Sequence, residues 1–423
     1  MPTDFKLSNM SKKVIIIGGG IVGLCSAYYL RKAGNQVTVL DKSRMDSGAS
    51  YVNAGYLTPS HIIPMAQPGM ISMGLKYMFN ASSPFYMKPR WDIDFFKWAL
   101  AFKKSSTTAH VDKAIPVIKE LNILSRELFM DIKASKDLGD FHLERKGLLM
   151  VYQTNKERDH ELMVAERAKF LGLDVKELDV QALKRIEPKV EFNAKGAIHY
   201  ECDAHSTPNL FMERMKAYLI EQGVSILKGQ EVVAIDPGKH AIVKTSDAEY
   251  KAEAIVLAAG SWSSKLTKKL GLKMLLEAGK GYNINSHQET GITMPAILME
   301  AKMAVTPMRS YTRFAGTMEF SGINHHIRKE RVNAIANGAE SFYRGLKITA
   351  AEKEGAQCGL RPVSPDGLPY VGKISRSQNI IIATGHAMMG WSLGPVTGKI
   401  VSDLLSDSTP IMDVSPFCPE RKF

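Results

Sequence analysis

Hydrophobic residues near the N-terminus of the 423-residue chain follow first the period of a buried strand and then that of a helix. KKVIII, residues 12–17, is a β-branched run typical of a buried parallel strand. Apolar residues then recur at helical spacing up to Gly34, which marks the C-terminal end of the helix. QVTVLD, residues 36–41, predicts a second parallel strand. The chain is therefore expected to begin with a β-α-β unit.

The turn inside this unit has the sequence GGGIVG, residues 18–23. Gly18 permits a tight turn, Gly20 lets the backbone approach a pyrophosphate, and Gly23 lets the helix and strand pack closely. Asp41, about 20 residues further on, suits a ribose diol and disfavours the 2′-phosphate of NADP. FAD and NAD both remain open at this point. The predicted dinucleotide contacts of the unit are Gly18, Gly20, Ile21, Val22, Gly23, Asp41 and Lys42.

Further buried strand patterns appear only far downstream. Residues 223–235 have the pattern of one strand, and residues 253–266 that of a strand that breaks at Ala259-Gly260 into a helix. Residues 379–405 predict another buried strand, a glycine-bearing turn and a long amphipathic helix. An NAD-dependent dehydrogenase would complete its sheet directly after the first unit. This spacing instead predicts a nucleotide domain that is assembled from distant segments.

The segments between these strands predict a second, α+β domain with an antiparallel sheet. GLLMVYQ and YTRFAGTMEF are strand-like runs set among helical patterns. We expect this substrate domain to be inserted twice into the nucleotide domain. The predicted division assigns 1–87, 197–273 and 355–423 to the nucleotide domain, and 88–196 and 274–354 to the substrate domain.

Composition and charge restrict the class of protein. A hydrophobic fraction of 45% and a charged fraction of 23% are those of an ordinary globular protein. The four cysteines form no CxxC pair, which favours a reducing compartment and predicts no metal site. The net charge of +12 is compatible with nucleic acid, an anionic membrane or an anionic small molecule, but the basic residues are scattered, so no nucleic-acid partner is expected. No apolar run is long enough to predict a membrane-spanning helix.

Five motifs together resemble those of the FAD-dependent D-amino acid oxidase/dehydrogenase superfamily, most closely its D-amino acid dehydrogenase and glycine-oxidase-like branch. They are GGGIVG with Asp41, SGASYVNAGYLTP (47–59), VLAAGSWS (256–263), CGLRPVSPDGLPYVG (358–372) and ATGHAMMGWSLGPVTG (383–398). The resemblance covers nearly the whole chain, and the last two motifs are the most specific. It implies a two-domain flavoprotein of the α/β class, with a Rossmann-like FAD-binding domain of the glutathione-reductase type, an α+β substrate domain and the flavin ring where the domains meet.

The resemblance also implies which residues contact FAD beyond the first unit. A helix that starts near Gly390 would direct its positive end at the flavin N1–C2=O edge, unless Gly390 and Gly394 serve only helix start and packing. The implied contacts are Ser50, Asn53, Ala54, Gly55, Val232, Ala259, Gly260, Trp262, Gly359, Arg361, Met388, Met389, Gly390, Trp391 and Ser392.

Candidate catalytic residues follow from the needs of an amino acid substrate. Its carboxylate requires a fixed cation, and Arg361 in GLRP stands at the family's position for this clamp, the alternative being an arginine that pairs with an acid at the domain interface. Arg309 and Arg313 are second candidates. Tyr282 and Tyr311 either cap the pocket or are half-buried strand aromatics.

His386 either orients the substrate or the flavin ring, or stabilises its loop. The implied reaction is hydride transfer from the substrate Cα to flavin N5, in which positioning matters more than a dedicated acid or base. The expected substrate is a small D-amino acid or a D-proline- or hydroxyproline-like imino acid, with electrons passed to a quinone-type or other acceptor. The alternatives are a glycine/sarcosine oxidase-like enzyme that uses oxygen and a non-catalytic flavin-fold binding protein.

A cytoplasmic protein is expected from these features. KPRWDIDFFKWALAFKK, residues 88–104, mixes aromatic residues with lysines. This segment either contacts the inner face of the cytoplasmic membrane or covers the substrate domain. Substrate handedness and the choice between oxidase and dehydrogenase stay open.

Overall fold

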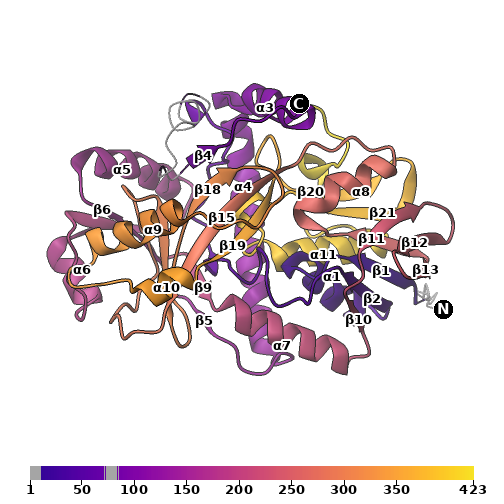
Figure 1. Ribbon diagram of the computed structural model, residues 1–423, viewed down its shortest axis with the longest axis horizontal. Helices are drawn as coiled ribbons and strands as arrows, with labels where there is room; N and C mark the ends of the chain where they lie inside the picture. The colour runs from indigo at the N-terminus through magenta and orange to yellow at the C-terminus, as the bar shows by residue number, and fades with distance from the viewer. Residues whose placement is uncertain (1–10, 71, 73–82, 84) are drawn as a thin grey trace, which may run out of the picture.

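The computed structural model describes residues 11–70, 72, 83 and 85–423. Positions 1–10, 71, 73–82 and 84 of the predicted segment 1–87 lie outside the described residues. Two large sheets organise the molecule, one on each side of the view, and the long helix α4 runs behind the centre (Figure 1).

The first sheet is six-stranded in the described part of the chain and parallel except for its last strand, which runs antiparallel to its neighbour. Its three segments lie far apart in sequence, as the pattern predicts. In order across the sheet, the strands are β10 (Ser225–Lys228), β2 (Gln36–Asp41), β1 (Lys13–Ile17), β14 (Ala254–Leu257), β21 (Ser377–Thr384) and β20 (Tyr370–Ile374).

Alternate residues of β1 fill the cores on the two faces of this sheet. Val14 and Ile16 pack with helices α1 (Ile21–Lys32) and α11 (Gly394–Leu405). Ile15 and Ile17 pack with an antiparallel meander and helix α8 on the other face. The meander and α8 are β11 (Val232–Asp236), β12 (Ala241–Thr245), β13 (Glu249–Ala252) and α8 (Ser263–Lys269).

The second sheet has nine strands within the described residues and is mostly antiparallel. Its path is β19 (Gln357–Val363), β15 (Glu277–Ser286), β18 (Thr312–Phe320), β17 (Met303–Pro307), β16 (Ala296–Leu298), β6 (Leu148–Tyr152), β8 (Gly196–Tyr200) and β7 (Val175–Asp179), with β4 (Phe85–Met87) beside β18. The helices close to this sheet in sequence are α5 (Asn155–Phe170), α6 (Val180–Ile186), α9 (Lys329–Phe342) and α10 (Ala350–Glu354).

A small third sheet connects the two halves of the molecule. Its described strands, in spatial order, are β3 (Tyr56–Leu57), β9 (Ala204–Ser206) and β5 (Leu143–Glu144). The other helices of the described residues are α3 (Ile93–Ser105), α4 (Thr108–Ser135), α7 (Pro208–Glu221) and the short 3₁₀ turns η1 (Gly260–Trp262), η2 (Ala387–Met389) and η3 (Ser415–Phe417).

The predicted α/β class is confirmed, but two predicted elements were wrong in detail. The expected single strand 223–235 is two strands in different sheets, because Gly229 adopts a φ of +72° and turns the chain between β10 and β11. The C-terminal helix begins at Gly394 rather than near Gly390, since η2 and a turn precede it.

The predicted domain boundaries stay a prediction. Two elements cross the expected division. Helix α4, in the predicted segment 88–196, packs its apolar face with α1 and α11 in the core of the first sheet. Strand β19, in the predicted segment 355–423, pairs with β15 of the second sheet.

Candidate functional site

A cavity of about 1400 Å³ lies between the two large sheets. Small-molecule pockets usually have about 300–1,000 Å³, so this one has room for a dinucleotide together with a small substrate. Its walls come from the glycine turn, the loop 47–54, η1, the bulged strand pair β15–β18, β19 and the segment 383–392.

The glycine turn forms one end of the cavity. Gly18 has a φ of +108°, and a Cβ there would lie 2.4 Å from the Ala258 carbonyl oxygen. A Cβ on Gly23 would lie 1.9 Å from the Gly18 carbonyl oxygen, so Gly23 packs the helix against the turn behind the cavity wall. Among the described residues, no hydrogen bond is found for the N–H groups of Gly20 and Val22 at the start of α1. These free donors and the positive end of the helix suit a phosphate.

Asp41 ends β2 at the edge of this turn. Its carboxylate accepts hydrogen bonds from the N–H of Gly19 at 2.7 Å and from the N–H and hydroxyl of Ser43 at 2.7 and 2.6 Å. The side chain is thus held at the position where the sequence predicts a ribose contact. Next to it, the Lys42 ammonium lies 3.9 Å from the centre of the Trp262 ring. Burial lowers the pKa of Lys42.

The loop 47–54 and the segment after β21 form the middle of the cavity. Ser50 accepts a hydrogen bond from the N–H of Ile21 at 2.9 Å, which joins the loop to the start of α1. The indole N–H of Trp391 donates to the Ser206 hydroxyl at 3.1 Å. Gly55 lies behind the wall, because a Cβ there would lie 2.1 Å from the Ser206 carbonyl oxygen.

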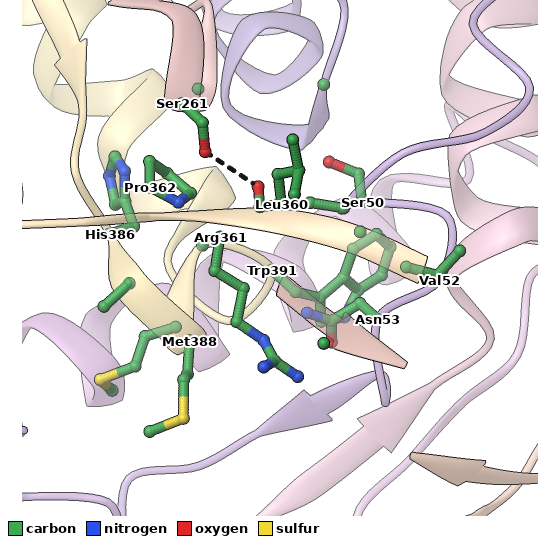
Figure 2. Close-up of a pocket in the computed structure, with 18 of the residues that line it drawn as sticks. Ser50, Val52, Asn53, Ser261, Leu360, Arg361, Pro362, His386, Met388 and Trp391 are labelled. Carbon is green, nitrogen blue, oxygen red and sulfur yellow. Dashed lines mark hydrogen bonds between the residues drawn. The ribbon is translucent and has the colours of Figure 1, made fainter. Parts of the chain in front are cut away.

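Arg361 projects from β19 into the cavity (Figure 2). Its Nη1 donates to the Thr317 carbonyl at 2.8 Å, and no described carboxylate lies within ion-pair distance of it. Burial lowers its pKa to about 10, so the guanidinium remains charged at neutral pH. A cation without an ion-pair partner in a cavity is suited to an anionic group of a ligand.

The Thr317 carbonyl faces Arg361 because of a β-bulge. The pairing of β15 with β18 shifts register between Lys280 and Tyr282, and Thr317 has a φ of +66° in the left-handed region. Bulges of this kind redirect backbone groups and are common beside active sites. The sequence gives no sign of the bulge, since the apolar pattern of β18 runs through it.

Comparisons with known proteins agree with this geometry. The profile of the DAO family, FAD dependent oxidoreductase, matches residues 13–404. The chain belongs to this family. A D-amino acid dehydrogenase of Helicobacter pylori is 30% identical over 402 residues, which cover 94% of this chain and 96% of that protein. Another from Neisseria meningitidis serogroup C is 28% identical over 409 residues, with 93% and 96% covered.

Solved structures show the same fold. Glycine oxidase from Geobacillus kaustophilus has a TM-score of 0.77 at 21% identity and covers 98% of this chain and 99% of its own. L-alpha-Glycerophosphate oxidase from Mycoplasma pneumoniae with FAD bound has a TM-score of 0.70 at 17% identity, with 93% and 94% covered. The predictions of the family, of FAD as the cofactor and of an oxidoreductase are therefore confirmed.

The cavity of this FAD-dependent oxidoreductase brings together most of the predicted cofactor contacts. Gly23 and Gly55 are the two that support the wall from behind. The predicted residues that line it are Gly18, Gly20, Ile21, Val22, Asp41, Lys42, Ser50, Asn53, Ala54, Val232, Ala259, Gly260, Trp262, Gly359, Arg361, Met388, Met389, Gly390, Trp391 and Ser392. That these residues bind FAD remains a prediction, supported by the cradle at Gly18 and the free donors of α1.

Tyr282 and His386 also line the cavity, but the Tyr282 hydroxyl and Nε2 of His386 already have protein partners. The Tyr282 hydroxyl donates to the buried carboxylate of Glu319 at 2.7 Å, so the ring forms wall and the hydroxyl points away. Nε2 of His386 lies 2.9 Å from the Thr397 hydroxyl on α11. Burial lowers the pKa of His386 to about 3, which keeps the ring neutral.

Three predicted substrate residues lie outside the cavity. The buried Arg313 donates to the carbonyls of Tyr51 and Asn53 at 2.9 and 2.6 Å and to Asn285 and Tyr311, so it holds the loop 47–54 in place. Tyr311 packs on His287, and Arg309 reaches Asp140 at 3.1 Å. The structure thus gives these three side chains no contact with the space where a substrate would lie.

Several residues that line the cavity were not predicted from the sequence. Apart from Ser261, which lies in VLAAGSWS, they belong to none of the five motifs, because loops and bulges bring them to the cavity from unrelated positions. Those closest to the features described are Ser43, Met45, Ser261, Thr317, Met318 and His325. The ring of His325 stacks on Trp262 with a centroid distance of 6.1 Å and an interplanar angle of 15°.

Proposed function

We propose that this chain catalyses the FAD-dependent oxidation of small D-amino acids or D-imino acids. The partly buried guanidinium of Arg361, which has no ion-pair partner among the described residues and lines the cavity, carries the proposal, because an amino acid brings the carboxylate that such a cation binds. The names of the curated relatives, D-amino acid dehydrogenase, support the substrate class.

Bound FAD supplies an acceptor for the hydride of the substrate Cα–H, after which water hydrolyses the imine product. The residues of the chain have to hold the substrate in place and exclude water. Arg361 binds the carboxylate and thereby fixes the direction of the Cα–H bond. The Thr317 carbonyl holds the guanidinium, and the buried Trp391 and Met318 cover the adjoining walls. No titrating base is required if the amine binds in its neutral form.

Anaerobic bleaching of the flavin absorbance tests this function. The purified holoenzyme is mixed with the D- and L-forms of alanine, proline and hydroxyproline, and with glycine and sarcosine. We expect bleaching by D-forms and slow or no bleaching by their L-forms. Bleaching by L-forms alone would contradict the assigned handedness, and no bleaching by any compound would contradict an amino acid oxidoreductase.

We further propose that electrons leave to a quinone at a membrane surface, contacted through residues 88–104 on the cytoplasmic side. Helix α3 packs Phe95, Trp98 and Phe102 inward, whereas Phe96 and Leu100 are exposed beside Lys97, Lys103 and Lys104. An apolar face bordered by lysines suits a membrane interface. None of the described helices has the length and apolar character to cross a bilayer. All four cysteines are free thiols, which supports the cytoplasmic side.

The position of α3 supports this route for electrons. The cluster that anchors α3 contains Met318, with Met65, Met70 and Phe85 packed against it, and these four residues also line the cavity. A membrane-bound acceptor at α3 would therefore approach the cavity from its apolar side. Reoxidation of the bleached enzyme should be faster with a quinone than with oxygen; the reverse order would favour an oxidase.

A further inference from the structure

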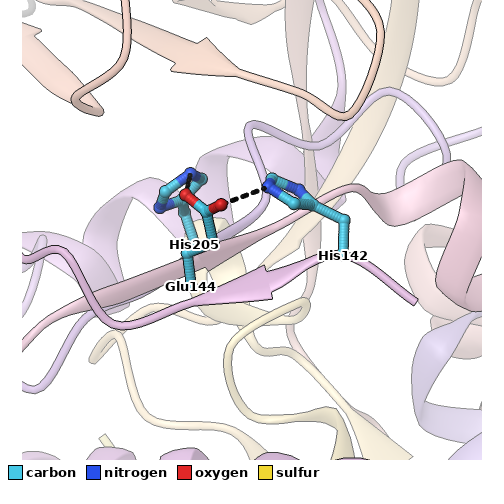
Figure 3. Close-up of side chains that lie close together, drawn as sticks. All are labelled: His142, Glu144 and His205. Atoms are coloured by element: carbon cyan, nitrogen blue, oxygen red, sulfur yellow. Dashed lines mark ion pairs between the residues drawn. The ribbon is translucent and has the colours of Figure 1, made fainter. Parts of the chain in front are cut away.

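Two imidazoles and a carboxylate meet on the small sheet, outside the FAD cavity. Glu144 in β5 and His205 in β9 are direct cross-strand partners, and His142 precedes β5. Figure 3 shows the Glu144 carboxylate between the two rings. Its oxygens lie 3.6 Å from Nε2 of His142 and 3.7 Å from Nε2 of His205. One ligand atom from each of the three residues lies within 4.8 Å of the others.

His205 makes this cluster unusual. Its side chain is fully buried, and neither ring nitrogen has a hydrogen-bond partner of regular distance and angle among the described residues, although the Pro307 carbonyl lies beside the ring. Buried polar atoms are nearly always paired, so an unpaired imidazole that faces a carboxylate needs an explanation. The contact of 3.7 Å with Glu144 is too long for a hydrogen bond. A small cation between the three groups would satisfy the ring.

We propose that His142, Glu144 and His205 bind a divalent transition metal of the Zn²⁺ class. Nitrogen and carboxylate ligands about 2.0–2.2 Å from a tetrahedral Zn²⁺ lie about 3.3 Å from one another. The separations of 3.6 and 3.7 Å from the two carboxylate oxygens are close to this spacing, and the three ligand atoms, which lie within 4.8 Å of one another, would move together on binding. Three protein ligands leave the fourth position to water.

The surroundings of the rings favour ligation. The Thr207 hydroxyl lies 2.8 Å from Nδ1 of His142 and thus orients Nε2 toward Glu144, as outer hydrogen bonds do at metal sites.

A lysine competes with the metal for the same carboxylate. The ammonium of Lys146 lies 2.7 Å from Oε2 of Glu144, and both side chains are partly exposed. Such an exposed pair is weak, so it would give way to a divalent ion. Substitution of Lys146 should therefore strengthen metal binding, whereas substitution of a ligand should weaken it.

The metal would join β5 to β9, next to the wall of the FAD cavity. Ser206, adjacent to His205, donates its N–H to the Gly55 carbonyl at 2.8 Å and accepts from Trp391. The expected role is therefore structural. The sequence predicted no metal site because the cysteines form no CxxC pair and the acid-rich segments lack metal-loop spacing. The ligands here are two histidines and a glutamate, and His205 lies more than 60 positions after the other two.

Metal retention by the FAD-loaded protein tests the proposal. The holoenzyme is stripped with a chelator, dialysed against Zn²⁺ and analysed for bound metal per chain. We expect one Zn²⁺ per chain in the wild type and at least tenfold weaker Zn²⁺ binding in His142→Gln and Glu144→Gln. Lys146→Met is expected to bind Zn²⁺ more tightly, because it frees the carboxylate.

The matched control is His240→Gln, which removes an exposed histidine in the β11–β13 meander. It should bind Zn²⁺ as the wild type does. His142 lies at the edge of the cluster. His142→Gln should therefore fold and retain FAD even if a substitution at His205 prevents folding. The proposal would be overturned if the wild type retained no Zn²⁺, or if the wild type and both ligand variants retained it equally.

Discussion

At the scale of single residues, Arg361 combines a buried position with a free charge. Its Nη1 donates to the Thr317 carbonyl and weakly to the Met318 sulfur, and the rest of the guanidinium faces the cavity. This arrangement argues against the alternative that Arg361 pairs with an acid to hold the domains together. It also means that removal of the side chain breaks no ion pair among the described residues.

Arg361→Leu is expected to lower kcat/KM for D-amino acids on the order of 10²-fold, which corresponds to about 3 kcal/mol for a lost charge-assisted hydrogen-bond pair. The kcat/KM of Arg361→Lys should lie between the values of the wild type and Arg361→Leu, because an ammonium cannot form a bidentate contact. Steady-state kinetics and FAD content per chain measure the effect. Wild-type kinetics in the leucine variant would exclude a substrate contact.

Asp203 makes stability depend on pH. Its carboxyl is fully buried, accepts from the N–H and hydroxyl of Ser60 at 3.0 and 2.5 Å, and burial raises its pKa from 3.8 to about 7. Between pH 4 and 7 the folded chain therefore holds a proton that the unfolded chain has lost, so stability falls as pH rises through this range. The slope from one such group is at most about 1.4 kcal/mol per pH unit.

Asp203→Asn should remove this contribution and flatten the loss of stability between pH 4 and 7. Chemical unfolding at several pH values measures it, with the exposed Asp159→Asn as the control. A variant whose pH profile is the same as that of the wild type would show that Asp203 is ionised in the fold.

At the scale of elements, the bulge between β15 and β18 makes space for the arginine. A Cβ on Gly281 would lie 2.2 Å from the Arg361 guanidinium. Gly281→Ala should therefore displace a flexible side-chain end and raise KM for the amino acid by about tenfold, while FAD content and fold are kept. Gly355→Ala, where the nearest atom would lie 3.5 Å away, is the control. Unchanged KM in Gly281→Ala would mean that Arg361 is not fixed by the bulge.

Elements with a local cause could be predicted from the sequence, and elements set by distant contacts could not. The first β-α-β unit could be predicted from the periodicity of its apolar residues and from Gly34, and β2 has the predicted limits of 36–41. The division of 223–235 depends on Gly229, whose N–H donates to the Ser43 carbonyl far away in sequence. The bulge at Thr317 likewise exists only because two strands pair out of register.

The same distinction holds for the site. The glycine turn and Asp41 were found because one helix and two strands position them. Arg313 lies in β18, a strand that borders the cavity, and Tyr311 directly precedes this strand, but their side chains point toward the back of the loop 47–54 or away from it. Which face of a strand meets a cavity depends on the opposing sheet, which a single sequence pattern does not contain.

At the scale of the whole molecule, the outer face of α3 is expected to attach the enzyme to membranes. Phe96→Glu combined with Leu100→Glu should weaken binding to anionic, quinone-containing vesicles by about tenfold or more, because two apolar side chains are lost from the interface. Activity with a soluble acceptor should not change. Phe170→Glu, at a residue that is 90% exposed at the end of α5, is the control. Vesicle cosedimentation measures the effect, and equal binding of both variants would contradict the docking role of α3.

The six-stranded sheet has a consequence for how the enzyme is made. Its strand β21 and the following segment, which completes the cavity wall up to Ser392, are near the end of the 423-residue chain. During translation, the glycine turn therefore leaves the ribosome hundreds of residues before β21 and the segment up to Ser392 are synthesised. FAD is therefore expected to bind late in biosynthesis. A nascent chain truncated before β21 should contain no bound flavin.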